Sequence, residues 1–308
     1  MSEQLLAAVD CGTNSVRLLV SRLVDGRLVE VDRRLHITRL GQGVDATGEF
    51  HPEALARTLD AMADFGEELD RLGVQRRRVV ATSAARDAAN SAEFFAGVRA
   101  RLGVQAEIIP GEEEARLSYA GAVGALAGLV QPVLVMDIGG GSTELVLGSD
   151  GTARQAVSLD IGSVRLRERF LHSDPPSPAE VGAATTHVDA LLDGSGIDFG
   201  AVGTWVGVGG TVTSLSALVQ GLATYDRARV HGSVVNRDQL DELGGRLLAM
   251  PVAAVADLPT MVPGRADVIC AGALICHRVA ARVPGVLTIS EADILDGLVR
   301  GLADDSRL

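Results

Sequence analysis

Two short stretches of the sequence combine an aspartate with a glycine-rich turn. The first is VDCGTNSV at residues 9–16, and the second is MDIGGGST at residues 136–143. In both, the aspartate follows an apolar residue and precedes a glycine by two positions, and a serine stands three positions after that glycine. Successive backbone N–H groups in such a turn form a concave site for anions. Two of these turns facing each other would therefore hold a chain of phosphate groups between them.

The side chains of both turns add hydrogen-bond donors to this anion site. A third glycine turn, GVGGT at 207–211, joins a predicted strand to a predicted helix, and the N-terminus of a helix also attracts anions. An arginine after the first turn supplies positive charge. The predicted phosphate-binding residues are Gly12, Thr13, Asn14, Ser15, Arg17, Gly139, Gly140, Gly141, Ser142, Thr143, Gly210 and Thr211.

The aspartates of the two turns, Asp10 and Asp137, are predicted to lie at the floor of the cleft. Their negative charge would repel phosphate oxygens unless a cation lay between them. Mg²⁺ binds carboxylate, phosphate and water oxygens together. The sequence therefore predicts a Mg²⁺ site here, with Mn²⁺ as the alternative ion.

Each turn lies between two predicted strands, and this pattern occurs twice. Residues 5–11, 16–24 and 27–37 indicate three antiparallel strands, and Asp25-Gly26 is a typical hairpin turn. Helices and strands follow, and the same plan returns in the second half. We therefore expect two β-β-β-α-β-α halves that face each other across a cleft.

The length and composition indicate how many domains to expect, which partners to exclude and which compartment is favoured. The 308 residues suggest two domains, which we place at 1–128 and 129–308. A net charge of −12 argues against nucleic acid as a partner, although a local basic cleft can still hold a polyanion. No apolar run reaches the about 18 residues that span a membrane. Three cysteines without a CxxC pair and the absence of a signal peptide favour the cytoplasm.

The sequence resembles the exopolyphosphatase / guanosine pentaphosphate phosphohydrolase family over nearly its whole length. The segments that carry the resemblance are AAVDCGTNSVRLLV, VVATSAARDAANSAEF, EIIPGEEEARLSYAGAV, VLVMDIGGGSTELVLG and VGVGGTVTSLSAL. This family belongs to the wider superfamily of actin, sugar kinases and Hsp70-like ATPases. The resemblance implies an α/β fold of two RNase H-like domains with the active site in the interdomain cleft. It also implies hydrolysis of a terminal phosphoanhydride.

The same resemblance assigns roles to individual residues. It points to Glu114, in the GEEEAR segment, as the residue that activates water, with Glu113 as the second choice. It marks Asp137 and Glu144 as Mg²⁺ ligands, with Asp10 opposite them. Arg86, in the segment ATSAARDAAN, is expected to bind phosphate, because an arginine can donate two parallel hydrogen bonds to it.

Several functions remain open at this point. We expect a Mg²⁺-dependent exopolyphosphatase acting on inorganic polyphosphate. The alternatives are hydrolysis of guanosine pentaphosphate, an ATP-dependent kinase of the same fold, and a sensor that binds guanosine polyphosphate or polyphosphate without turnover. The acids at 112–114 argue against the kinase. The resemblance also leads us to expect a homodimer, and we expect no nucleic-acid or membrane partner.

Overall fold

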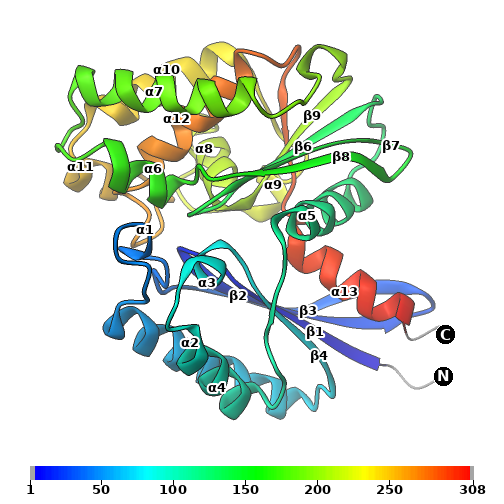
Figure 1. Cartoon of the computed structure of the whole chain (residues 1–308). Helices are drawn as coiled ribbons and strands as arrows, with labels where there is room; N and C mark the ends of the chain where they lie inside the picture. The colour runs from blue at the N-terminus through cyan, green and yellow to red at the C-terminus, as the bar shows by residue number, and fades with distance from the viewer. Residues whose placement is uncertain (1–3, 306–308) are drawn as a thin grey trace.

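The structure is a computed structural model that describes residues 4–305 of the chain. It consists of two lobes, each built on one mixed β-sheet (Figure 1). This is the two-lobed α/β architecture expected from the sequence. No helix in the described range is both long enough and apolar enough to cross a membrane.

The sheet of the first lobe has five strands in the order β3-β2-β1-β4-β5. Strands β1 (Gln4–Cys11), β2 (Ser15–Val24) and β3 (Arg27–Ile37) form an antiparallel meander, which confirms the three strands predicted there. Strands β4 (Arg76–Ala81) and β5 (Glu107–Ile108) continue the sheet in parallel with β1. Because parallel strands need a crossover, the helices between β3 and β4 and between β4 and β5 are placed beside the sheet.

The helices of the first lobe bury apolar side chains against this sheet. Helix α2 starts with Pro52 in its first turn, where a missing N–H costs nothing, and ends at Leu72, followed by Gly73 with a left-handed backbone. Its Met62 and Phe65 pack into one core with Phe94. The helices of this lobe are α1 (Val44–Thr47), α2 (Pro52–Leu72), α3 (Ser83–Asp87) and α4 (Ser91–Leu102).

The second lobe repeats the meander in a six-stranded sheet of order β10-β11-β9-β6-β7-β8. Strands β6, β7 and β8 correspond to β1, β2 and β3, and β9 pairs in parallel with β6. Its strands are β6 (Val133–Ile138), β7 (Thr143–Ser149), β8 (Thr152–Leu159), β9 (Thr204–Val208), β10 (Val234–Val235) and β11 (Leu287–Ile289). Its helices are α6 (Ser163–Phe170), α7 (Pro178–Asp193), η1 (Phe199–Ala201), α8 (Gly209–Val219), α9 (Arg227–Val230), α10 (Arg237–Ala249), α11 (Val252–Ala256) and α12 (Ile269–Ala280).

Two helices lie between the lobes, and each covers the sheet of the opposite half of the sequence (Figure 1). Helix α5 (Gly111–Ala125) packs on β6, β7 and β8, whereas α13 (Ile294–Asp305) packs on β1 and β2. The two helices also contact each other. A Cβ on Gly121 would lie 1.9 Å from the carbonyl oxygen of Asp293, so only glycine allows this approach. Helix packing thus crosses the predicted boundary at residue 128 in both directions, and the division into 1–128 and 129–308 stays a prediction.

Candidate active site

The two Asp-Gly turns have the same local geometry. Gly12 N donates to the carbonyl oxygen of Ser15 at 3.0 Å, and Gly139 N donates to that of Ser142 at 3.0 Å. Each turn joins the first two strands of its meander, so the two strands position it. The two stretches, which share a sequence pattern, therefore also share a backbone conformation.

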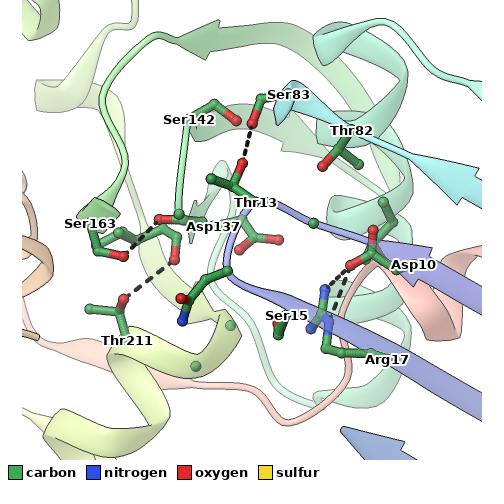
Figure 2. A pocket seen from close by; sticks show the side chains of 18 of the residues that line it. Asp10, Thr13, Ser15, Arg17, Thr82, Ser83, Asp137, Ser142, Ser163 and Thr211 are labelled. Carbon is green, nitrogen blue, oxygen red and sulfur yellow. Dashed lines mark hydrogen bonds and ion pairs between the residues drawn. The ribbon is translucent and has the colours of Figure 1, made fainter. Parts of the chain in front are cut away.

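The turns also lie directly against each other, as the sequence predicts. A Cβ on Gly140 would lie 3.0 Å from Cβ of Thr13, and a Cβ on Gly141 would lie 2.4 Å from Oγ of Ser83. Oγ1 of Thr13 and Oγ of Ser83 share a hydrogen bond of 2.8 Å (Figure 2). A side chain at Gly141 would therefore clash with Ser83 and Thr13 of the first lobe, and one at Gly140 would press on Thr13.

A cavity opens between the two turns and the first turns of α5 and α8. Most of the predicted site residues line it: Asp10, Gly12, Thr13, Asn14, Ser15, Arg17, Glu114, Asp137, Gly139, Gly140, Ser142, Glu144, Gly210 and Thr211. Residues from both sheets and from both halves of the chain thus meet at one place.

Four of the predicted residues do not line this cavity. Thr143 is fully buried and its hydroxyl donates to the carbonyl oxygen of Ile161, so its side chain does not reach the cavity and its phosphate contact stays a prediction. Glu113 forms an ion pair with Arg78 at 2.9 Å and lies outside the cavity. Gly141 also lies outside the cavity lining, and its carbonyl oxygen accepts from Nε of Arg165. The fourth is Arg86.

Arg86 does not line the cavity but forms a hydrogen bond with Glu114, which does. Its Nη1 donates to Oε2 of Glu114 at 3.0 Å and to the carbonyl oxygen of Ile109 at 2.9 Å. Burial raises the pKa of Glu114 to about 7, against the lowering effect of the Arg86 charge. At neutral pH Glu114 is therefore poised to accept a proton.

Asp137 and Glu144 occupy opposite positions on β6 and β7 and point to the same face. Ser118 Oγ donates to Oδ2 of Asp137 at 2.8 Å, and Ser158 Oγ donates to Oε1 of Glu144 at 2.7 Å. Burial raises the pKa of Asp137 to about 6. Burial, with the charges of Glu114 and Asp137, raises the pKa of Glu144 well above its usual range.

Asp10 and Arg17 occupy the equivalent positions on β1 and β2. Arg17 donates to Oδ2 of Asp10 from Nε at 3.1 Å and from Nη2 at 2.6 Å (Figure 2). Burial still raises the pKa of Asp10, although Arg17 lowers it. The other oxygen, Oδ1, is buried without a hydrogen-bond partner in the described part of the chain.

This unpartnered oxygen fits a bound cation. A buried carboxylate oxygen without a donor is costly, and a metal ion would satisfy it. No group of three or more His, Cys, Asp or Glu side chains within residues 4–305 is arranged to hold an ion by itself. Mg²⁺ does not need one, because it commonly uses one or two carboxylates and completes its shell with waters and substrate phosphates.

Arg265 is the second arginine of the cavity wall. It donates from Nη1 to the carbonyl oxygen of Gly210 at 2.9 Å and to Oγ of Ser214 at 2.7 Å. Burial lowers the pKa of Arg265. Across the described residues no carboxylate forms an ion pair with it, so its charge is available to an anion in the cavity.

Sequence reasoning missed several residues that hold the site together. Ser118 lies four residues after Glu114 on α5, hence on the same helix face, and this spacing could have revealed it. Ser158 lies opposite Glu144 on β8, and strand alternation could have indicated it. Thr82, Ser83 and Ser163 also line the cavity.

Comparison with known proteins identifies relatives of this chain. A family model described as the Ppx/GppA phosphatase family matches residues 19–301. Exopolyphosphatase 2 of Mycobacterium tuberculosis is 47% identical over 97% of this chain and 98% of that protein. The guanosine-5'-triphosphate,3'-diphosphate pyrophosphatase of Aeromonas hydrophila is 32% identical over 97% of this chain and 59% of its own length. A crystal structure of an exopolyphosphatase-like protein superimposes with a TM-score of 0.93 at 38% identity, covering 98% and 99% of the two chains.

Proposed function

The chain belongs to the Ppx/GppA phosphatase family, and from this premise we propose that it is an exopolyphosphatase. It would hydrolyse the terminal phosphoanhydride of inorganic polyphosphate and release orthophosphate. The observation that carries the proposal is a buried Glu114, with a pKa of about 7, in the same cavity as the two Asp-Gly turns. The similarity to exopolyphosphatase 2 supports the choice of substrate.

In this reaction the residues of the cavity bind phosphate and move one proton. The turns around Gly12 and Gly139 would hold phosphate oxygens through backbone N–H groups. Glu114 would accept a proton from a water molecule as that water's oxygen bonds to the terminal phosphorus. The bond from phosphorus to the bridging oxygen breaks, and the shortened polyphosphate leaves with the charge of that oxygen. Arg17 and Arg265 would offset the charge that develops.

We also propose that Asp10, Asp137 and Glu144 hold Mg²⁺, with Mn²⁺ as the alternative ion. The unpartnered Oδ1 of Asp10 and the raised pKa values of all three carboxyl groups support this, because a cation favours their charged forms. When bound, such an ion supplies charge neutralisation of the phosphate oxygens.

Hydrolysis of guanosine pentaphosphate is the second candidate. A chamber of about 280 Å³ adjoins the phosphate cavity and shares Arg17 and Arg265 with it. Tyr225, Val262 and Leu295 give this chamber apolar walls, and an aromatic ring is a suitable platform for a base.

One experiment separates these functions. Phosphate release would be measured from long-chain polyphosphate, guanosine pentaphosphate and ATP, with and without Mg²⁺. We expect metal-dependent release from polyphosphate, reduced about 10²-fold or more in Glu114→Gln, the scale of lost acid–base catalysis. Glu112→Gln is the matched control, because Glu112 lies on the same helical turn but its side chain is 71% exposed.

Each other outcome favours a different function. Full activity of Glu114→Gln would show that another group activates the water. Release from guanosine pentaphosphate alone would select the second candidate. Consumption of ATP only with an acceptor would indicate a kinase, and tight binding without turnover would indicate a sensor.

The remaining expectations about location and partners stay predictions. These are the cytoplasm, the homodimer, and the absence of nucleic-acid and membrane partners.

A further inference from the structure

Arg17 has a second carboxylate partner that comes from the far end of the chain. Besides its two hydrogen bonds to Asp10, its Nη1 donates to Oδ2 of Asp293. The two carboxylates hold the guanidinium between them, and the Arg17 side chain is only 18% exposed. Asp293 lines the adjoining chamber but not the phosphate cavity, whereas Arg17 lines both.

The backbone around Asp293 is firmly placed. It lies between β11 and α13, after a turn in which Ser290 Oγ donates to the carbonyl oxygen of Ala292 at 2.8 Å. The carbonyl oxygen of Asp293 lies against Gly121 of α5, at the contact that no side chain could occupy. Helix α5 also carries Glu114, so the same helix positions both the acid of the site and the anchor of Arg17.

The two oxygens of Asp293 have different partners. Oδ1 accepts from Leu295 N at 3.0 Å and thereby satisfies an N–H at the start of α13. Oδ2 accepts from Arg17. The side chain is 7% exposed, so both hydrogen bonds are protected from water.

This arrangement leaves part of Arg17 available to substrate. A guanidinium has five N–H donors in a fixed fork. Three hydrogen bonds to carboxylates occupy Nε, Nη1 and Nη2. One further N–H on each Nη atom has no partner in the described residues, and Arg17 lines the phosphate cavity.

We propose that Asp293 is a positioning residue that fixes the guanidinium of Arg17 for binding substrate phosphate. Asp10 alone would not fix the guanidinium of Arg17. Its carboxylate contacts only the Nε and Nη2 side of the guanidinium through Oδ2, and its other oxygen, Oδ1, is the one that fits a cation. The proposal rests on the proposed function for the identity of the substrate. It does not depend on turnover, since it concerns binding.

Asp293→Asn is the informative variant. Asparagine keeps one oxygen for Leu295 N, so α13 stays capped, but its NH₂ group then faces a donor of Arg17. We expect KM for polyphosphate to rise about tenfold, the factor that corresponds to 1.4 kcal/mol, with kcat changed less than about threefold. The affinity for inorganic tripolyphosphate, measured by calorimetry, should fall by the same factor.

Asp296→Asn is the matched control. Asp296 lies at the same helix end, pairs with Arg33 at 3.0 Å and does not line the phosphate cavity. Its Oδ2 also accepts from Asp293 N at 3.0 Å, and the side-chain oxygen of asparagine can still accept this hydrogen bond. Its substitution removes the same charge from the same region and should leave KM and the tripolyphosphate affinity unchanged. Thermal unfolding of both variants should show equal stability.

A double-mutant cycle decides whether Asp293 acts through Arg17. In an Arg17→Met background, Asp293→Asn should have no further effect on binding. Equal losses with and without Arg17, or equal effects of Asp293→Asn and Asp296→Asn, would overturn the proposal. So would a failure of the wild type to bind tripolyphosphate. If the wild type binds tripolyphosphate but does not hydrolyse polyphosphate, the proposed function fails while the calorimetric cycle still tests Asp293.

Discussion

Removal of the Arg86 side chain should shift the pH dependence of the reaction. The Arg86 Nη1 to Glu114 Oε2 hydrogen bond is 3.0 Å long, and the two side chains are 23% and 12% exposed. A charge-assisted hydrogen bond of this kind contributes about 1.5–3 kcal/mol. Since one pKa unit corresponds to about 1.36 kcal/mol, Arg86→Met should raise the pKa of Glu114 by about one to two units.

The sign of the effect follows from the role proposed for Glu114 as a general base. A general base acts in its deprotonated form, so kcat/KM rises with pH through the pKa of that base. A higher pKa moves this acid limb to higher pH. At pH 6 the variant should therefore lose about 10- to 100-fold more activity than it loses above the new pKa.

The assay is a profile of kcat/KM against pH for phosphate release, from about pH 5 to about pH 10, so that it extends above the raised pKa. Arg78→Met is the control, because Arg78 pairs with Glu113 at 2.9 Å on the same helix start but does not contact Glu114. An acid limb that stays in place or moves to lower pH in Arg86→Met would refute the reasoning. A shift of equal size in Arg78→Met would refute it as well.

Two further predictions concern the turn and the metal. Gly162→Ala should lower the free energy of unfolding by about 1–3 kcal/mol, because the new Cβ would lie 2.3 Å from the backbone of Gly140; Gly182→Ala, in open space on α7, should raise it by up to about 1 kcal/mol. Urea unfolding measures both, and equal effects would contradict the steric argument. Ser118→Ala should weaken Mg²⁺ or Mn²⁺ binding about 10- to 100-fold, because it removes the donor that orients Asp137. Mn²⁺ titration followed by electron paramagnetic resonance would show this, and an unchanged affinity would contradict the role of Ser118 in orienting Asp137 as a ligand.

The sequence predicted the parts of the site that depend on local pattern. Strand alternation and glycine spacing identified both turns, and the two hairpins then placed Asp10 opposite Arg17 and Asp137 opposite Glu144. The same alternation explains why the side chain of Thr143 does not line the cavity. Thr143 precedes Glu144 on β7, so the two side chains point to opposite faces, and only one of them can reach the cavity.

The parts that depend on tertiary contacts could not be predicted. The amphipathic pattern of α13 indicates that the helix packs, but it does not say that the helix returns to the first sheet. Asp293 is 276 residues away from Arg17 in the chain, and no local pattern connects them. Arg86 was expected to bind phosphate because its side chain is suited to that, yet in the structure its partner is Glu114.

The cavity combines features that work against folding and favour catalysis. Glu114, Asp137, Glu144 and Asp10 all have pKa values raised by burial, so the folded protein holds their charged forms at a cost that the unfolded chain does not have. This cost follows from burial, because the charged form of a carboxyl group loses solvation when it is shielded from water. A cation bound among these acids would favour their charged forms and release protons. The same burial thus gives Glu114 a pKa near neutrality and raises the pKa of the other three acids, which a bound cation would lower again.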